Sequence, residues 1–432
     1  MKTSILVGIT LCLLLLALPA AASDYTLGIF GNANEDDTIN MQDVTYTELI
    51  ILEYRDRTEL ADGKYDGKIN MQDVTQIELV ILGRELELTV LDLADRAVTI
   101  NKPVERVVLT FGCYPEFVAI EGGNNPFEKI VGWDNSWYKW RRWIYEKYRS
   151  EFPEIEDITY VGSVGKDFSV EKVISLKPDL VTMYPGSIKN AETAVEQLDQ
   201  AGIPTICVDY HTETIETHAR STLMLGYMLG KEERAQEIVD FYIEHVTEVY
   251  SRVDNVDKPK PKVYVECGME GPSEYSNTYG DLMWGALIET CGGTNIAKDV
   301  VEGWGPINPE YLLDANPDVI IITGSYWADN PGSMKLGYYA DYEESRELLK
   351  AFTERPGWDT LDAVKNNRVY SIHHGISRHI YDFAPIQYMA KCFYPEEFED
   401  LDPEENFKEF HERFLPVDCS GVWMMSLEEE TE

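Results

Sequence analysis

Apolar residues recur at helical spacing in one long stretch near the middle of the chain. Within Lys231–Val253 the intervals between apolar positions are three or four residues, with charged residues between them. This spacing places the apolar side chains on one face of a helix of roughly 34 Å. Gly230 precedes the pattern, and Pro259 and Pro261 prevent its continuation. The apolar positions are Ala235, Ile238, Tyr242, Val246, Val249 and Val253.

The segments on either side of this predicted helix share a second pattern. Ser169–Met183 (SVEKVISLKPDLVTM) and Asn308–Ile322 (NPEYLLDANPDVIII) each contain a capped short helix, a Pro-Asp corner and an apolar run. The proline ends the helix, and the apolar run is typical of a strand buried on both faces. The repetition predicts two α/β lobes with a cleft between them, joined by the long helix. A surface helix of one large α/β domain is the alternative.

A closer repetition lies near the N-terminus. INMQDVTYTELIIL (Ile39–Leu52) returns as INMQDVTQIELVIL (Ile69–Leu82), and a loop rich in oxygen-bearing side chains precedes each copy. The oxygens stand at the alternate positions from which a calcium ion takes its ligands in loop–helix sites. Lys64 stands where a ligand is expected in the second loop, so this site should be weaker or use water. The predicted ligands are Asn32, Asn34, Asp36, the Thr38 carbonyl, Asn40 and Asp43 in the first loop, and Asp62, Asp66, the Lys68 carbonyl, Asn70 and Asp73 in the second.

Composition restricts the possible functions. The 432 residues are enough for two or three domains, and the first 22 combine a lysine, an apolar run and a small-residue end typical of a secretory signal. The formal net charge of −40 argues against nucleic-acid binding, because phosphate attraction drives that binding. Six cysteines follow the signal without a CxxC pair, so they are either free thiols or disulfides and do not indicate structural zinc. They are Cys113, Cys207, Cys267, Cys291, Cys392 and Cys419.

The N-terminal repeat resembles the dockerin domain over Gly28–Arg84, because each loop ends in Asp instead of Glu and is followed by a helix. Dockerins bind cohesin modules, so the resemblance implies attachment to a scaffold or surface protein. Met41-Gln42 and Met71-Gln72 occupy the positions at which dockerins select their partner. A calcium-stabilised spacer within the chain is the alternative.

From Leu86 onward the chain resembles the periplasmic substrate-binding proteins of ABC importers for iron-siderophore complexes and vitamin B12. The motifs that carry the resemblance are, in order, DLADRAVTI, PVERVV, LKPDLV, AGIPTICVD, the long helix, CGGTNIA, NPDVIII and AVKNNRVYSI. The resemblance implies two Rossmann-like lobes joined by one rigid helix, with the ligand in the cleft and ABC permease subunits as partners. We therefore expect an α/β fold preceded by a small all-α calcium-loop domain. The expected segments are a signal peptide (1–22), a dockerin-like domain (23–86), the N-terminal lobe (87–230), the connecting helix (231–253) and the C-terminal lobe (254–432).

Ligands of open α/β sheets bind beyond the carboxyl ends of the strands. Aromatic side chains in the strand-end loops would supply apolar area, and the cations would bind acidic oxygens of a chelate. His373, His374 and His379 either ligate a metal or only hydrogen-bond the chelator, and Arg141 and Arg142 either recruit an anion or form surface ion pairs. The predicted ligand-binding residues are Tyr114, Lys166, Tyr184 and Tyr210 in the first lobe, and Trp304, Trp327, His373, His374 and Arg378 in the second.

The predicted function is an exported solute-binding protein of an ABC importer, held outside the cell or at its surface through the dockerin. Its ligand would be a metal chelate: a ferric siderophore, a corrinoid or a haem. The sequence contains no GxSxG, HExxH or P-loop motif, so we do not expect an enzyme. The alternative is a dockerin-borne component of a cohesin-scaffolded complex that binds or degrades polysaccharide, which for degradation needs two facing carboxylates.

Overall fold

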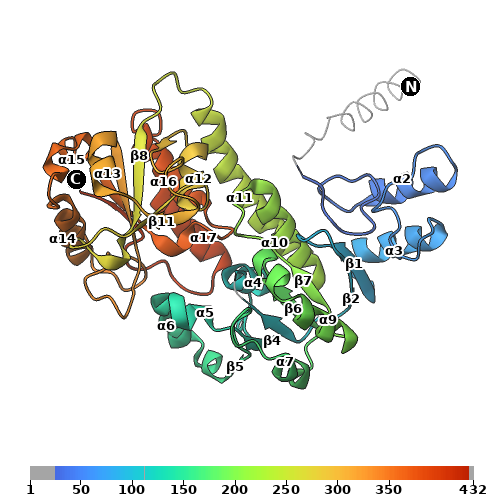
Figure 1. The fold of residues 1–432 in the computed structure, drawn as a ribbon. Coiled ribbons are helices and arrows are strands. Elements are labelled where there is room, and N and C mark those ends of the chain that lie inside the picture. Colours follow the sequence, from blue (N-terminus) through green and yellow to red (C-terminus); the bar gives the residue numbers. More distant parts are fainter. Residues whose placement is uncertain (1–24, 111, 428–432) are drawn as a thin grey trace, which may run out of the picture. The chain divides into compact units, whose positions relative to one another are not determined.

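The computed structural model describes residues 25–110 and 112–427 (Figure 1). The chain divides between Leu91 and Asp92 into two compact units, and each is described by itself. The predicted signal peptide lies outside the described residues. No helix of the described residues is long and apolar enough to cross a membrane.

The first unit contains the two copies of the repeat as two helices of equal length. Each helix begins at an asparagine, Asn40 or Asn70, whose side chain accepts a hydrogen bond from the first turn. The aspartate three residues later, Asp43 or Asp73, accepts one in return from the backbone of that asparagine, which stabilises the helix start. The predicted loop–helix repeat is therefore present. The elements are α2 (Met41–Ile51), α3 (Met71–Ile81) and β1 (Glu87–Leu91).

The second unit begins with a parallel sheet, which defines the first lobe. In the described residues its strand order is β5-β4-β3-β6-β7, with every neighbouring pair parallel. The Ser169 side chain caps α7, Lys177 ends it in the left-handed region, and the strand after Pro178 is fully buried, as the sequence predicts. The strands of this sheet are β3 (Val107–Leu109), β4 (Ile130–Trp133), β5 (Thr159–Tyr160), β6 (Leu180–Met183) and β7 (Thr205–Cys207), and β2 (Ala97–Asn101), which is not part of it, precedes them in the chain. The helices are α4 (Tyr114–Glu121), α5 (Ser136–Trp140), α6 (Arg142–Glu151), η1 (Pro153–Asp157), α7 (Val170–Leu176), α8 (Pro185–Asn190), α9 (Glu192–Gln200) and α10 (Ile215–Leu229).

The helix predicted for Lys231–Val253 is present as α11 (Glu232–Val253), the long helix that follows α10 in Figure 1. Ala235, Ile238, Val246 and Val249 are buried, so the predicted apolar face is the face that packs. The helix contacts α10 and α4 of the first lobe and α16 (Phe383–Phe393) of the second. It lies in the sequence between the two large sheets.

A mixed sheet forms the second lobe. In the part of the chain that the structure describes, the strand order is β11-β9-β8-β12-β13-β14, with β10 also paired to β8. The central strands β8, β12 and β13 are parallel. The Asn308 side chain caps α13, and β12 after the Pro-Asp corner is buried throughout, so the predicted pattern occurs in both lobes. The strands are β8 (Lys262–Cys267), β9 (Asn277–Tyr279), β10 (Thr294–Asn295), β11 (Trp304–Pro306), β12 (Val319–Gly324), β13 (Val369–His373) and β14 (Met424–Ser426). The other helices are η2 (Gly268–Glu270), α12 (Trp284–Thr290), α13 (Pro309–Ala315), α14 (Tyr342–Thr353), η3 (Trp358–Thr360), α15 (Asp362–Lys365), η4 (His374–Ile376) and α17 (Pro403–Phe414).

The structure decides the state of the cysteines, which the sequence left open. All six cysteines within the described residues are free, and five of them are buried. A buried free cysteine packs as a small apolar side chain, so these residues contribute to the cores of the lobes.

Candidate ligand-binding pocket

A pocket of about 490 Å³ lies between the strand ends of the two lobes. This volume is within the range of about 300–1,000 Å³ that is usual for small-molecule sites. Because parallel strands end at one edge of their sheet, the loops that follow them gather there. From the first lobe the wall takes Asp134, Ser136, Lys139, Trp140 and Arg141 after β4, Ser163, Val164 and Lys166 after β5, and Tyr184 and Ser187 after β6. From the second lobe it takes Cys267 and Met269 at the end of β8, Trp304 in β11, Trp327 after β12 and His374 after β13.

The cations of the pocket all come from the first lobe. Lys139 donates a hydrogen bond to Ser163 and lies 4.2 Å from the ring centre of Tyr160, and Lys166 lies 5.8 Å from the ring centre of Trp140. Arg141 forms no ion pair with any described residue, and burial lowers the pKa of its guanidinium. Arg141 therefore places on the first-lobe wall a positive charge with which no described carboxylate forms an ion pair.

Arg141 also reaches the second lobe. A Cβ atom added to Gly375 would lie 2.6 Å from Arg141 Nε, so the guanidinium packs directly against this backbone. The absence of a side chain at Gly375 leaves the space that Arg141 occupies. This contact places the charge at the junction of the two lobes.

Asp134 is the one carboxylate among the described pocket residues. Its Oδ1 accepts hydrogen bonds from the Ser136 backbone at 3.0 Å and from the Tyr114 hydroxyl. Tyr114 is buried, and burial together with the Asp134 charge raises the pKa of its phenol. Tyr114 therefore supports Asp134 from behind and does not line the pocket, contrary to the prediction.

The described second-lobe residues of the wall include no Asp, Glu, Lys or Arg side chain. Two tryptophans, Trp304 and Trp327, belong to it, and Trp304 is 52% exposed. His374 lies 5.6 Å from the Trp327 ring, centre to centre. Its Nδ1 is within hydrogen-bond distance of Thr323 Oγ1 (2.9 Å) and the Tyr279 hydroxyl (3.3 Å). The two walls thus differ in character, one cationic and one aromatic.

Of the predicted ligand-binding residues, Lys166, Tyr184, Trp304, Trp327 and His374 line the pocket. The other four do not, and besides Tyr114, described above, each of the remaining three has a protein partner instead. The buried hydroxyl of Tyr210 lies 2.9 Å from Thr222 Oγ1, and His373 Nδ1 accepts from the Gly375 backbone while its ring packs on Trp423. Arg378 donates to Glu213 at 3.2 Å.

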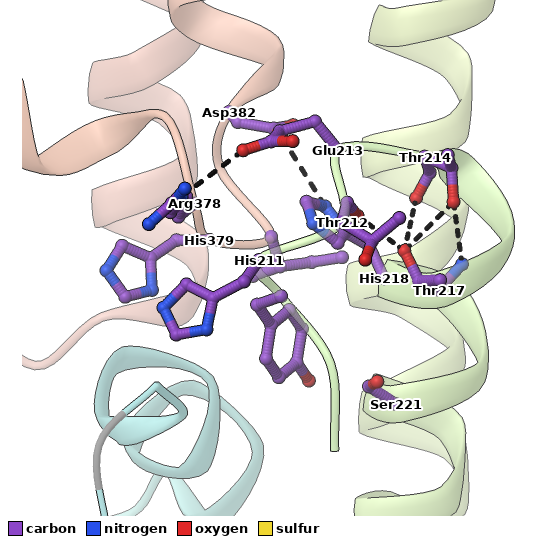
Figure 2. A network of polar contacts seen from close by, with 12 residues as sticks. His211, Thr212, Glu213, Thr214, Thr217, His218, Ser221, Arg378, His379 and Asp382 are labelled. Carbon is purple, nitrogen blue, oxygen red and sulfur yellow. Dashed lines mark hydrogen bonds and ion pairs between the residues drawn. The ribbon is translucent and has the colours of Figure 1, made fainter. Parts of the chain in front are cut away.

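Arg378 and His379 link the two lobes, and Figure 2 shows the pairing of Arg378 with Glu213. Arg378 pairs with Glu213 after β7, and His379 Nδ1 lies 3.0 Å from Oε1 of the buried Glu116 in α4. The Ile380 backbone donates to the same Glu116 oxygen. Two adjacent residues of the second lobe therefore bind two acids of the first lobe, so Arg378 acts in lobe contact and not in the pocket wall.

Figure 2 also shows His218 beside Asp382. Asp382 Oδ2 lies 3.6 Å from His218 Nδ1, and both side chains are buried. Burial raises the pKa of Asp382 well above its ordinary value and lowers that of His218 to about 3. Both shifts favour the neutral form of their group, so burial opposes an ion pair between them.

Asp134 and Lys139 are pocket residues that the predicted set does not include, and Arg141, for which the sequence left an anion site and a surface ion pair open, also lines the pocket. They follow β4, whose sequence IVGW is short and contains Gly132. Such a segment gives a weak strand signal, because glycine has low β propensity. The sequence that follows it, residues 134–143 (DNSWYKWRRW), is rich in aromatic and cationic side chains, and this composition could have identified the loop as a binding segment.

The predicted calcium loops in the first unit offer oxygen donors. In the first loop, Asn32 is fully buried and its Oδ1 has no hydrogen-bond partner among the described residues. Asp43 is also buried, and burial raises the pKa of its carboxyl to about 6, which a nearby cation would oppose. These features fit a hard cation, although the described residues contain no group of three or more His, Cys, Asp or Glu side chains placed to hold a metal.

Three of the predicted ligands in the second loop are carboxylates, against two in the first, and all three accept hydrogen bonds from the backbone. Asp62 accepts from the backbones of Asp66 and Gly67, and Asp73 accepts from the backbones of Lys64 and Asn70. Burial raises the pKa of Asp73 as it does that of Asp43. The two loops therefore share their buried final aspartate, and only the first has the unpaired amide oxygen.

Comparison with known proteins gives one family match and several relatives. The model of a family described as periplasmic binding protein matches residues 128–374, which lie in the second unit. The chain is 25% identical over 319 residues, 72% of this chain and 87% of the relative, to the uncharacterized ABC transporter substrate-binding lipoprotein YvrC of Bacillus subtilis. It is 29% identical over 180 residues to the vitamin B12-binding protein of Salmonella typhi, which covers 42% of this chain and 63% of that protein.

Among solved structures, the TroA-like periplasmic binding protein FepB from Veillonella parvula is similar with a TM-score of 0.76. Its sequence identity is 44%, and the match covers 79% of this chain and 99% of the other. The likeness extends over both the sequence and the fold of the unit that contains the pocket.

Proposed function

The chain belongs to the periplasmic binding protein family, and from that premise we propose that it captures an anionic metal chelate in the pocket between its lobes. At the level of the family it is the substrate-binding protein of an ABC transporter, and proteins of this kind are not enzymes. The permease subunits of the importer would receive the ligand.

The observation that carries the proposal is the unpaired cation of the first-lobe wall. Arg141 is partly exposed to the pocket, and none of the described carboxylates pairs with it. A guanidinium held away from bulk water is favourable when an anion reaches it, and it binds carboxylate or phosphate oxygens with two parallel hydrogen bonds. Lys139 and Lys166 on the same wall extend the positive surface. The ligand should therefore bring negative charge to this side.

The aromatic wall indicates the rest of the ligand. Trp304 and Trp327 line the pocket on this wall, and Tyr184 lines it from the first lobe. Burial of apolar ligand surface there contributes roughly 25 cal/mol per Å² removed from water. A large ligand with an apolar face and an anionic edge uses both walls. Vitamin B12, the ligand in the name of the Salmonella typhi relative, is a metal chelate and supports this class.

The polysaccharide alternative finds little support in the pocket. Glycoside hydrolysis generally uses two carboxyl groups on opposite sides of the bond that breaks. Among the described pocket residues only Asp134 carries a carboxylate, and Tyr114 and Ser136 already bond to it.

The proposal is tested first by visible absorption of the protein purified from its native source, because iron chelate, haem and corrinoid differ in colour. Tryptophan fluorescence titrations with haemin, cyanocobalamin and a ferric tris-catecholate then measure affinity. Arg141→Gln should weaken binding by at least about tenfold, the value of a charge-assisted hydrogen bond.

The neighbouring arginine supplies a matched control. Arg142 pairs with Glu146 on its own helix at 2.6 Å and packs on Tyr138, so Arg142→Gln should leave the affinity unchanged. Equal losses from both variants would show that Arg141 has no specific role. Micromolar affinity for an oligosaccharide, with no affinity for any chelate, would support the polysaccharide alternative.

We propose in addition that the first unit is a calcium-loaded dockerin that tethers the protein to a cohesin outside the cell. Met41 and Met71 stand at equivalent places of the repeat, and each is 57% exposed. If either copy presents the same apolar surface, Met41→Asp or Met71→Asp alone should retain cohesin binding, and the double variant should lose it. Pull-down with an immobilised cohesin in calcium and in chelator measures this. Binding that is insensitive to chelator would refute the calcium-dependent tether.

A further inference from the structure

The second-lobe wall of the pocket carries a set of donor atoms that the proposed function does not yet use. Cys267, Met269 and His374 line this wall and contribute a thiol sulfur, a thioether sulfur and an imidazole nitrogen. Soft and borderline donors of this kind bind transition metals, whereas hard cations prefer oxygen. The chemistry of this wall therefore differs from that of the calcium loops.

His374 is held in one orientation by groups behind it. Thr323 Oγ1 and the Tyr279 hydroxyl both lie at its Nδ1, and both of these residues are buried. None of the described residues bonds to His374 Nε2, the other ring nitrogen. Metal-binding histidines are usually oriented in this way, through a hydrogen bond at the nitrogen that does not ligate. The ring therefore has one anchored nitrogen and one available nitrogen.

The same surroundings keep the ring neutral. Burial lowers the pKa of His374 well below its ordinary value, and the charges of Arg141 and Arg378 lower it further. When Nδ1 carries the proton and donates it to Thr323, the lone pair lies on Nε2. Cys267 differs, because burial raises the pKa of its thiol and so disfavours the thiolate that a metal prefers.

We propose that His374 Nε2 binds the metal of the captured chelate directly. The inference rests on the proposed function and narrows the ligand class to a complex that keeps an open coordination position. A planar metal macrocycle with acidic side groups meets the requirement, since its face would lie on the tryptophan wall and its acids on the cationic wall. A ferric complex whose chelator already fills every position does not meet it. Binding would exchange a water or other weak ligand of the metal for the imidazole, with no change in oxidation state.

The test uses the full chain and two probes that differ only in the metal: haemin and metal-free protoporphyrin IX. His374→Ala should lower haemin affinity by at least about tenfold and change its visible spectrum, whereas affinity for the metal-free ring should change little. Added imidazole should restore the wild-type haemin spectrum in the variant, because the free base can enter the space left by the side chain.

Two further variants test which atom binds. Cys267→Ser and Met269→Leu remove the sulfur donors and should leave the haemin spectrum nearly unchanged. Should His374→Ala not fold, electron paramagnetic resonance of the wild-type haemin complex still distinguishes nitrogen from sulfur or oxygen at the iron. A sulfur ligand, or a His374→Ala spectrum identical to wild type, overturns the inference.

A ferric tris-catecholate, which has no open position, distinguishes failure of the inference from failure of the proposed function. If the protein binds this complex tightly and does not bind haemin, the chelate-binding function stands and the assignment of His374 is wrong. If it binds none of these three probes and does not bind cyanocobalamin, both proposals fail.

Discussion

Acidification should stabilise the first calcium loop when calcium is absent. The carboxyl group responsible is Asp43, which is fully buried at the start of α2. Burial raises its pKa from 3.8 to about 6, and the charge of Asp36 adds to the increase. Hydrogen bonds from the backbones of Asn34 and Asn40 oppose the increase without cancelling it.

The sign follows from the direction of this shift. A carboxyl whose pKa is higher in the folded state binds its proton more tightly there, so folding is favoured as the pH falls from about 6 towards 3.8. One pKa unit corresponds to about 1.4 kcal/mol, so the full effect is about 3 kcal/mol. When the pH is lowered from 7 to 4.5, the free energy of unfolding of the loop rises by about 2 kcal/mol, which changes the folding equilibrium constant roughly thirtyfold. Bound calcium would remove the gain, because the ion favours the ionised carboxylate and protons compete with it.

Amide hydrogen exchange of the α2 segment in the full chain measures this effect locally. After correction for intrinsic exchange rates, protection in chelator should be roughly thirtyfold greater at pH 4.5 than at pH 7. In calcium the dependence should vanish or reverse. Asp43→Asn removes the titrating group and should flatten the profile even though it also changes a hydrogen bond. Protection that does not rise on acidification in chelator, or that rises equally in Asp43→Asn, would refute the reasoning.

Three further predictions concern the second unit. Gly375→Ala should displace the Arg141 guanidinium, because the added Cβ would lie 2.6 Å from Arg141 Nε. Haemin affinity, measured by fluorescence titration, should then fall by about fivefold. An unchanged affinity would contradict the contact between Arg141 and Gly375. Glu116→Gln should weaken the hydrogen bond between residue 116 and His379 by about 1–2 kcal/mol, and amide hydrogen exchange in residues 377–382 should become faster. Unaltered exchange there would show that this contact does not hold the two lobes together. If α11 is a stiff connection, solution scattering should show only a slight decrease in radius when ligand binds, and a large compaction would indicate a wide hinge.

The sequence by itself determined the elements whose pattern is local. The intervals in Lys231–Val253 predict a helix because side chains three or four apart share a helix face, and α11 buries that face. The capped helix, proline and apolar run recur in both lobes because capping and the missing proline N–H act within a few residues. The loop–helix repeat near the N-terminus is local for the same reason.

The tertiary structure alone decided which of two neighbouring residues serves the pocket. His373 and His374 are adjacent, yet one packs on Trp423 and the other faces the ligand site, because successive residues at a strand end point to opposite sides. Arg141 and Arg142 are also adjacent, and Arg142 finds its acid one helical turn away while Arg141 extends to the other lobe. Whether a charge is neutralised depends on groups distant in sequence, and only the assembled lobes bring them within the few ångströms over which ion pairs and hydrogen bonds act.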